Sequence, residues 1–331
     1  MTLTEYANFS NYAVASATVV LALAWLASVA QWAFGSVASR SGESVGAAER
    51  TPVMASSGGA YDGVSGGGSP TADDDSARGG VAEERSEVAG RIAIALTILG
   101  FLILLAGVVA RGLAAERVPW GNMYEFAITS MVVVLAGYLV MIRLMHIQWL
   151  APLVLAFVTV VLGLSMTVYV PAGPLVPALD SYWLVIHVAS AMVAGAGFLV
   201  GAGASILYLI KARAEARGPV SGYLGRLPSA AAMDQLAYRV TAFAFPVWTF
   251  AALISGPIWA EHAWGRPWGW DPKEVWAFIT WVAYAGYLHA RATAGWKGKA
   301  AAILALVAFA TFIFNFVGVN LFFPGLHSYA K

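Results

Sequence analysis

Long apolar runs with few charges are the feature that most constrains how this chain can fold. Of its 331 residues, 60% are hydrophobic and 11% are charged, whereas a soluble domain carries about 25% charged residues. Each run is close to the roughly 20 residues that a helix needs to cross a hydrocarbon core about 30 Å thick. The sequence therefore predicts an all-α, polytopic membrane helix bundle of about eight transmembrane helices. The predicted spans cover residues 12–34, 91–110, 123–142, 149–170, 182–210, 240–259, 273–291 and 299–322.

Residues 36–90 differ from the rest of the chain. They are rich in Gly, Ser, Ala and Asp and contain almost no bulky apolar side chain. Because such a segment buries too little apolar surface to offset the entropy of folding, we expect a disordered linker. The predicted organisation is a first transmembrane helix within 1–35, this linker, and a membrane domain at 91–331.

Lys and Arg are unevenly divided among the loops. With residues 36–91 placed on the cytoplasmic side, fourteen of the nineteen Lys and Arg residues fall in cytoplasmic segments. Cytoplasmic loops of membrane proteins carry such an excess. We therefore expect a multi-pass protein of the plasma membrane, with both termini and residues 259–274 on the extracytoplasmic side. No cleavable signal peptide is expected, because no basic segment precedes the first apolar run.

Composition also limits the chemistry of the chain. There is no cysteine, so disulfides, iron–sulfur clusters and a thiolate nucleophile are excluded. A metal would have to be bound by His, carboxylate or Met ligands. The net charge of +1 gives no basis for binding nucleic acid.

Tryptophans are concentrated in one short segment. Trp259, Trp264, Trp268 and Trp270 fall within twelve residues, and the Gly and Pro residues between them argue against one continuous helix. An ordinary interfacial belt of aromatic residues would spread over many span ends. The clustering predicts instead a platform on one loop for a flat, apolar ligand.

The residues that follow have the composition of a helix start. Asp271 suits the N-cap, Pro272 the first helical position, and Glu274 completes a capping box. Asn122 and Glu125 have the same spacing before the third span, which also predicts a helix start.

These motifs resemble a known family. The run W-A-x-x-x-W-G-x-x-W-x-W-D-P-K-E over 259–274, followed by Y-L-H-x-R at 287–291, is similar to the tryptophan-rich WWD signature of haem-handling membrane proteins. Within that group the chain most resembles the CcsA/ResC-type subunit of the System II cytochrome c synthase. The P-x-x-N-x-Y-E segment at 119–125 supports the resemblance, which covers roughly residues 91–331 and implies that this domain handles haem.

Three histidines are the candidate ligands of haem iron. An ionisable residue in a span is a functional candidate by default, and two imidazoles on opposite faces are one standard way to hold haem. His187 matches the family motif S-x-W-L-x-x-H-V and His327 matches G-x-H-S-Y, so the resemblance makes them the outer axial ligands. It makes His289, deep in the span 273–291, a ligand of an inner haem site. We interpret His146 as an interfacial residue, and His262 as incidental or as a backup ligand.

The resemblance implies a function in cytochrome c biogenesis. Haem b would enter at His289, move outward, and be held between His187 and His327 on the platform that also includes Asp271. With a Ccs1/ResB-type membrane partner, the chain would present haem for covalent attachment to Cys-x-x-Cys-His apocytochromes c, as a holocytochrome c synthase. Thiol-reducing proteins would act indirectly. Two alternatives remain open: a haem exporter or relay that forms no thioether bond, and a redox membrane cytochrome.

Overall fold

The computed structural model describes residues 1–49, 72–174, 179–293 and 295–327, and every regular element within them is helical. The long helices are α1 (Leu3–Glu49), α2 (Ala72–Ala115), α3 (Met123–Met145), α4 (Ala151–Ser165), α5 (Tyr182–Glu215), α7 (Ala230–Thr249), α9 (Pro272–Ala292) and α10 (Lys299–Ile313). The shorter ones are η1 (Gln148–Leu150), η2 (Met166–Val168), α6 (Gly222–Arg226), α8 (Gly256–Trp264), α11 (Val319–Phe322), and two π-helical segments, η4 (Phe250–Ser255) and η5 (Phe314–Gly318).

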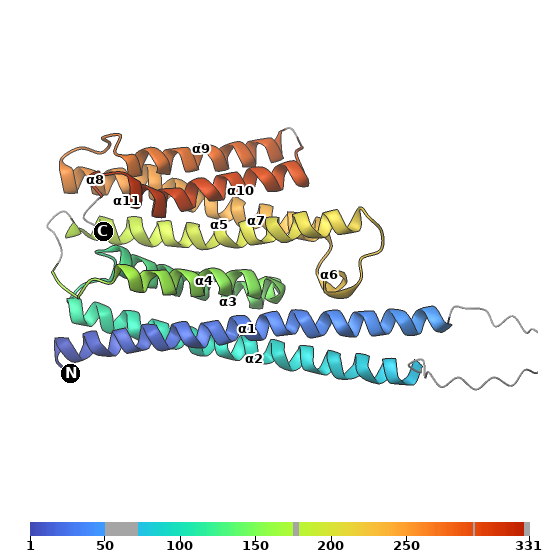
Figure 1. Cartoon of the computed structure of the whole chain (residues 1–331). Helices are drawn as coiled ribbons and strands as arrows, with labels where there is room; N and C mark the ends of the chain where they lie inside the picture. Colours follow the sequence, from blue (N-terminus) through green and yellow to red (C-terminus); the bar gives the residue numbers. More distant parts are fainter. Residues whose placement is uncertain (50–71, 175–178, 294, 328–331) are drawn as a thin grey trace, which may run out of the picture.

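The long helices lie side by side as a bundle. α1 and α2 form an antiparallel pair at one edge, α3 and α4 lie beside them, α5 and α7 follow, and α9 and α10 complete the opposite edge (Figure 1). The N-terminus, the starts of α3, α5 and α9, and the C-terminal segment all lie at one end of the bundle. This common end agrees with the charge count, and its placement outside the membrane stays a prediction.

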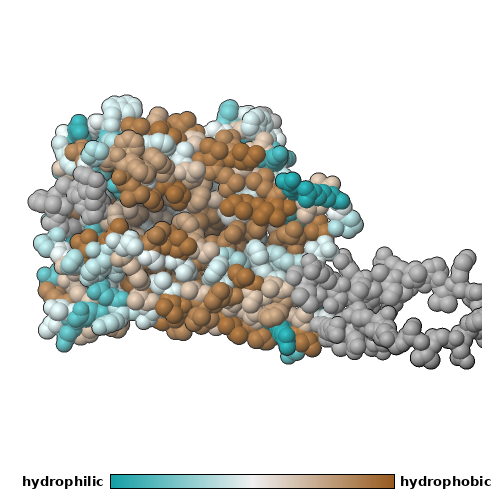
Figure 2. Space-filling view, in the orientation of Figure 1, coloured by the Kyte–Doolittle hydropathy of each residue, from teal (hydrophilic) through white to brown (hydrophobic). Residues whose placement is uncertain are grey.

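The apolar surface fits a membrane protein. Seven helical segments are long and apolar enough to cross a bilayer, and brown apolar residues cover much of the visible face in Figure 2 while the most hydrophilic residues lie toward its two ends. The seven helical segments match seven of the eight predicted spans. The eighth, 273–291, forms α9 beside α10 but is less apolar, because its Trp, Tyr and His residues are less hydropathic than aliphatic ones.

Helices extend into the predicted linker, residues 36–90. α1 continues to Glu49 and α2 begins at Ala72, so 36–49 and 72–90 are helical, and the linker stays a prediction. The reason in α2 is packing on neighbouring helices: Ser86 Oγ donates to the Gln31 carbonyl at 3.1 Å, and Ala82 and Ala89 are buried. The central part, 50–71, lies outside the described residues.

The tryptophan segment also differs from a single loop. The sixth span runs from α7 through η4 into α8, so Trp259 and Trp264 stand on a helix. Gly265 then ends α8 with a left-handed conformation, φ +68°, and only residues 265–271 are non-helical. Pro257 lies just after the π-helical turn η4, where the regular i→i−4 hydrogen-bond ladder is already interrupted, so it does not end the helix.

Candidate functional site

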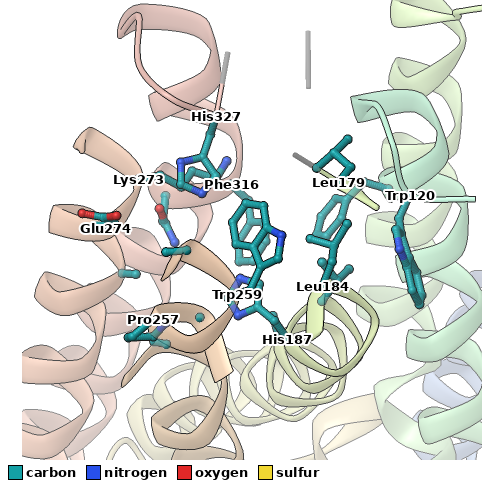
Figure 3. Close-up of a pocket in the computed structure, with 18 of the residues that line it drawn as sticks. Trp120, Leu179, Leu184, His187, Pro257, Trp259, Lys273, Glu274, Phe316 and His327 are labelled. Atoms are coloured by element: carbon teal, nitrogen blue, oxygen red, sulfur yellow. The ribbon is translucent and has the colours of Figure 1, made fainter. Parts of the chain in front are cut away.

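A cavity opens at the end of the bundle where the tryptophan-rich segment and the motifs around His187 and His327 meet. It has a volume of about 140 Å³ and is lined by residues of α3, α5, α7, α8, α9 and the segment around η5. Figure 3 shows its labelled side chains converging from these elements. His187, His327, Trp259, Trp264 and Trp268, five of the residues predicted from the sequence, line it together.

His187 is held by the π-helical segment η4. Ser181 caps the N-terminus of α5, which places His187 between one and two turns into that helix. Its Nδ1 lies 2.9 Å from the carbonyl oxygen of Ala251, so Nδ1 carries the proton and Nε2 the lone pair. A Cβ on Gly256 would lie 3.1 Å from the His187 ring. Glycine at 256 therefore lets α8 approach this histidine closely.

His327 is held by Asp271. Its Nδ1 lies 2.9 Å from Asp271 Oδ2, and Asp271 Oδ1 accepts the backbone N–H of Leu326 at 2.6 Å. Burial would raise the pKa of the Asp271 carboxyl, but the hydrogen bonds from His327 and Leu326 hold that pKa below its ordinary value. A charged carboxylate thus fixes the His327 ring, again leaving Nε2 with the lone pair.

The carboxylate of Asp271 is also the N-cap of α9. It caps α9 by accepting the backbone N–H of Lys273, and Glu274 Oε2 accepts the N–H of Asp271 in return. The predicted capping box is confirmed. Asp271 is not among the residues that line the cavity, so it acts on the site through His327.

Trp259 lies between the two histidines (Figure 3). Its indole stacks on His187 with ring centroids 5.9 Å apart and planes 9° from parallel, and its centroid is 5.7 Å from that of His327. Trp264 packs edge-on against Trp259 at 4.8 Å and against His327 at 5.0 Å. The aromatic rings and the two imidazoles therefore form one contiguous cluster.

Two residues predicted for the site, Trp270 and His289, lie elsewhere, as do the two remaining histidines. Trp270 is 69% exposed, has φ +56°, and packs against Trp268 rather than into the cavity. His289 is an exposed residue near the far end of α9 and lines no part of the cavity. His146 caps the far end of α3, and His262, also exposed, lies on α8 with Nδ1 at 2.7 Å from the Ile258 carbonyl.

The structure adds cavity residues that the sequence reasoning missed. They are Trp120, Trp248, Lys273, Asn315, Phe316 and Asn320, among others. A signal existed for two of them, because Asn315 and Asn320 are polar residues within an apolar span. Trp248 and Phe316 look like ordinary core residues in the sequence, and only the fold brings them to the cavity.

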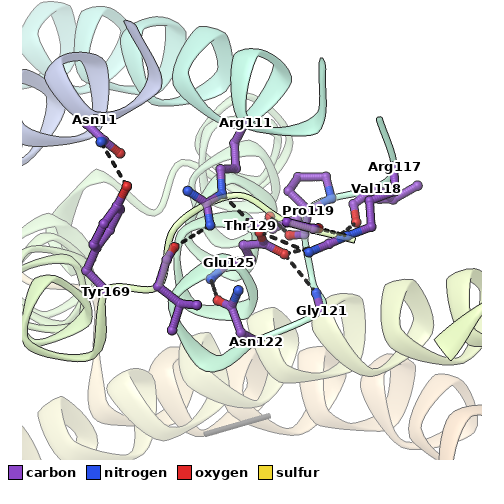
Figure 4. A network of polar contacts seen from close by, with 12 residues as sticks. Asn11, Arg111, Arg117, Val118, Pro119, Gly121, Asn122, Glu125, Thr129 and Tyr169 are labelled. Carbon is purple, nitrogen blue, oxygen red and sulfur yellow. Dashed lines mark hydrogen bonds and ion pairs between the residues drawn. The ribbon is translucent and has the colours of Figure 1, made fainter. Parts of the chain in front are cut away.

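A buried polar network supports the cavity from the side of α3 (Figure 4). Glu125 is fully buried; its Oε1 accepts Arg111 Nε at 2.9 Å and its Oε2 accepts Arg117 Nη1 at 2.7 Å. The predicted helix start is confirmed, since Asn122 accepts the Glu125 N–H. The reciprocal half of a capping box differs: Glu125 Oε2 accepts the N–H of Gly121.

This network joins three separate segments. Arg111, at the end of α2, donates through Nη2 to the Val170 carbonyl at 2.5 Å, and Arg117 donates through Nε to the Gly173 carbonyl at 3.2 Å. The loop before α3 and the stretch after η2 are thereby tied to α2. Because Trp120 and Asn122 belong to that loop and line the cavity, the network fixes one wall of the site.

Comparisons with known proteins identify the family of this chain. Residues 120–327 match the family described as Cytochrome C assembly protein. The chain is 34% identical over 264 residues to the cytochrome c biogenesis protein CcsA of Parasynechococcus marenigrum (strain WH8102), covering 71% of this chain and 85% of that protein. Identity to the CcsA of Synechococcus sp. (strain JA-3-3Ab) is 32% over 309 residues, or 76% and 89% of the two chains.

Two further matches are partial. The CcsA of Chlamydomonas reinhardtii is 44% identical over 158 residues, which are 48% of this chain and 43% of that protein. A solved structure titled Cytochrome c Heme Lyase CcmF superposes with a TM-score of 0.57 at 18% identity, covering 97% of this chain and 50% of that one. At this identity the likeness describes the fold alone, and this chain spans half the length of that structure.

Proposed function

We propose that this chain, which belongs to the Cytochrome C assembly protein family and acts in cytochrome c biogenesis, holds haem between His187 and His327. Haem b is the substrate in this proposal. The chain would present it, together with a Ccs1/ResB-type membrane partner, to an apocytochrome c that carries a Cys-x-x-Cys-His segment. It would thus share a holocytochrome c synthase activity.

The observation that carries the proposal is the way both imidazoles are anchored. A histidine that ligates a metal almost always donates its other ring N–H to a carbonyl or a carboxylate, which fixes the tautomer and raises the basicity of the ligating nitrogen. His187 has the Ala251 carbonyl and His327 has the Asp271 carboxylate at Nδ1. In the sequence they lie before and after the tryptophan-rich run 259–274, and in space the Trp259 ring lies between them.

Trp259 must move for both histidines to ligate one iron. Metal–imidazole bonds are about 2 Å long, so the two Nε2 atoms would stand about 4 Å apart across the metal, leaving no room for an indole. Ligand pockets are usually about 300–1,000 Å³, and the present 140 Å³ is smaller. We infer that a porphyrin displaces the Trp259 indole and takes its place between the imidazoles.

Positioning is the chemistry that these residues can supply. When a thiol adds across a vinyl group, its sulfur bonds to one vinyl carbon and its hydrogen goes to the other, so there is no leaving group and no oxidant. Holding the vinyl edge against the two thiols lowers the entropic part of the barrier. Cavity residues need act as neither nucleophile nor base. His289 would bind haem at an earlier, inner site on α9.

A visible spectrum of the purified complex tests the proposal. The full chain and its partner subunit are co-purified in detergent as wild type and as His187→Ala, His327→Ala and His262→Ala. We expect low-spin bis-histidine haem in the wild type, loss of that spectrum in the first two variants, and its recovery with added imidazole. His262→Ala is the matched control, because this exposed histidine of α8 does not line the cavity.

A second assay separates a synthase from a haem relay. The loaded complex is incubated with a reduced Cys-x-x-Cys-His peptide, and covalent haem on the peptide is measured after denaturation. Covalent product that depends on both histidines supports the synthase. Haem that leaves the complex without covalent product supports the relay, and a wild-type complex that never shows histidine-dependent haem refutes the proposal as a whole.

A further inference from the structure

Lys273 is a basic residue in the wall of the cavity, and within the described residues its side chain forms no ion pair with a carboxylate. Its ammonium Nζ donates to Asn320 Oδ1 at 2.8 Å and lies 5.6 Å from the centroid of the Phe316 ring. Burial in an apolar wall disfavours a charged amine, and an anionic ligand beside it would offset that cost.

The two acidic side chains closest in sequence are already engaged. Glu274 Oε2 accepts the backbone N–H groups of Gly269 at 2.8 Å and Asp271 at 3.1 Å. Asp271 accepts from Leu326, from the backbone of Lys273 and from His327. These bonds hold both carboxylates against the backbone, which leaves the ammonium group of Lys273 facing the cavity with a neutral amide as its partner.

Two further residues of the cavity carry buried polar atoms that have no hydrogen-bond partner among the described residues. Trp248 and Asn315 line the same cavity, each 2% exposed. The atoms are Trp248 Nε1 and Asn315 Oδ1. The Phe316 ring packs against Trp248 at 6.2 Å and is the ring beneath Lys273. Buried polar atoms normally have partners, so this wall is suited to a ligand with polar groups of its own.

Axial ligation does not fix the rotation of the porphyrin ring. Two imidazoles on opposite faces of a porphyrin define an axis through the iron, yet the ring can still rotate about that axis. Thioether formation needs the vinyl groups at one defined place, which requires a contact away from the axis. Lys273 lies in the cavity wall beside the cluster formed by His187, Trp259 and His327.

We propose that Lys273 binds a propionate carboxylate of haem and so sets the rotation of the ring about the iron axis. An ammonium–carboxylate contact is a charge-assisted hydrogen bond, stronger than one between neutral groups. With the carboxylate edge held at Lys273, the vinyl groups take a defined position. This inference rests on the proposed function, since it concerns the same cavity and the same ligand.

The test compares haem with a porphyrin whose propionates are neutral methyl esters. Haem and its iron dimethyl ester, in which both propionates are esterified, are titrated into the full chain with its partner subunit in detergent. We expect the wild type to bind haem at least about tenfold more tightly than the ester, the range of a hydrogen bond to a charged group. Lys273→Met should bind both equally and keep the wild-type affinity for the ester, whereas Lys273→Arg should keep the preference.

The controls separate this inference from its premise. Lys299→Met removes an exposed lysine at the start of α10 and should leave both affinities unchanged. Equal wild-type affinity for the two porphyrins, or a preference for haem that persists in Lys273→Met, would overturn the role of Lys273 while the low-spin spectrum stands. A wild type that gives no histidine-dependent spectrum with either porphyrin refutes the proposed function itself.

Discussion

Replacing Asp271 with asparagine tests how the second histidine is held. The Asp271 carboxylate accepts hydrogen bonds at both oxygens: Leu326 N–H at Oδ1, and Lys273 N–H and His327 at Oδ2. Asparagine has one oxygen and one NH₂ group, so it accepts on one side and donates on the other. In either amide orientation, the segment that carries His327 loses an acceptor.

The expected change in haem affinity follows from the hydrogen bond that Asp271→Asn removes. A hydrogen bond to a charged group contributes about 1.5–3 kcal/mol, and about 1.4 kcal/mol is a factor of ten in affinity. Replacing the partner of a metal-binding histidine costs about 10–100-fold in metal affinity in other proteins. We therefore expect Asp271→Asn to bind haem roughly 10–100-fold more weakly, with little change in the stability of α9, because asparagine is as good an N-cap as aspartate.

Haem titration of the purified complex, followed at the Soret band, measures this change. Asp271→Ala should lose about 1 kcal/mol more of unfolding free energy, since it also removes the cap of α9. Asp180→Asn, a change of an exposed carboxylate near the start of α5, is the matched control and should bind as the wild type does. If Asp271→Asn binds haem with wild-type affinity and a low-spin spectrum, Asp271 is a helix cap only.

Three further changes test other parts of the structure. Glu125→Gln should lower the free energy of unfolding by about 3–5 kcal/mol, because it removes the charge that two arginines share; an unchanged thermal midpoint in detergent would argue against a structural role of this network. In Gly325→Ala, the new Cβ would clash with Asp271 Oδ1, so we expect the free energy of unfolding to fall by about 1–3 kcal/mol together with weaker haem binding. Gly286→Ala, whose Cβ meets nothing within 4 Å, is its control in the same thermal and haem assays, and equal behaviour of the two variants would contradict the crowding argument. Trp259→Leu should speed haem association in stopped-flow measurements, since a smaller side chain is displaced from between the imidazoles, and slower association would show that the indole recruits the ligand.

Local patterns in the sequence were enough for much of the architecture. Seven of eight predicted spans are helices of sufficient length and hydropathy, because burial of backbone polar groups in lipid forces every apolar run of that length into a helix. The capping box of Asp271 and Glu274 was also predictable, since it depends on residues three apart. Family membership followed from motifs that lie within short stretches of sequence.

Contacts between distant segments were decided by the tertiary structure. Trp259 lies between His187 and His327, and Lys273 faces the cavity with Asn320. Both arrangements depend on the packing of α5, α8, α9 and α11. The sequence placed four tryptophans on one platform, yet Trp270 is exposed and packs against Trp268 outside the cavity.

The extent of α1 and α2 shows the same division. Composition alone predicted disorder from residue 36 to residue 90, whereas both helices run beyond the predicted spans. Hydropathy predicts whether a segment is apolar enough to lie in lipid. It does not predict whether a polar segment forms a helix by packing against its neighbour. The sequence by itself therefore determined which segments are helical spans and which motifs they carry, and only the tertiary structure decided which side chains share the cavity, since those contacts join residues too far apart for any local periodicity to encode.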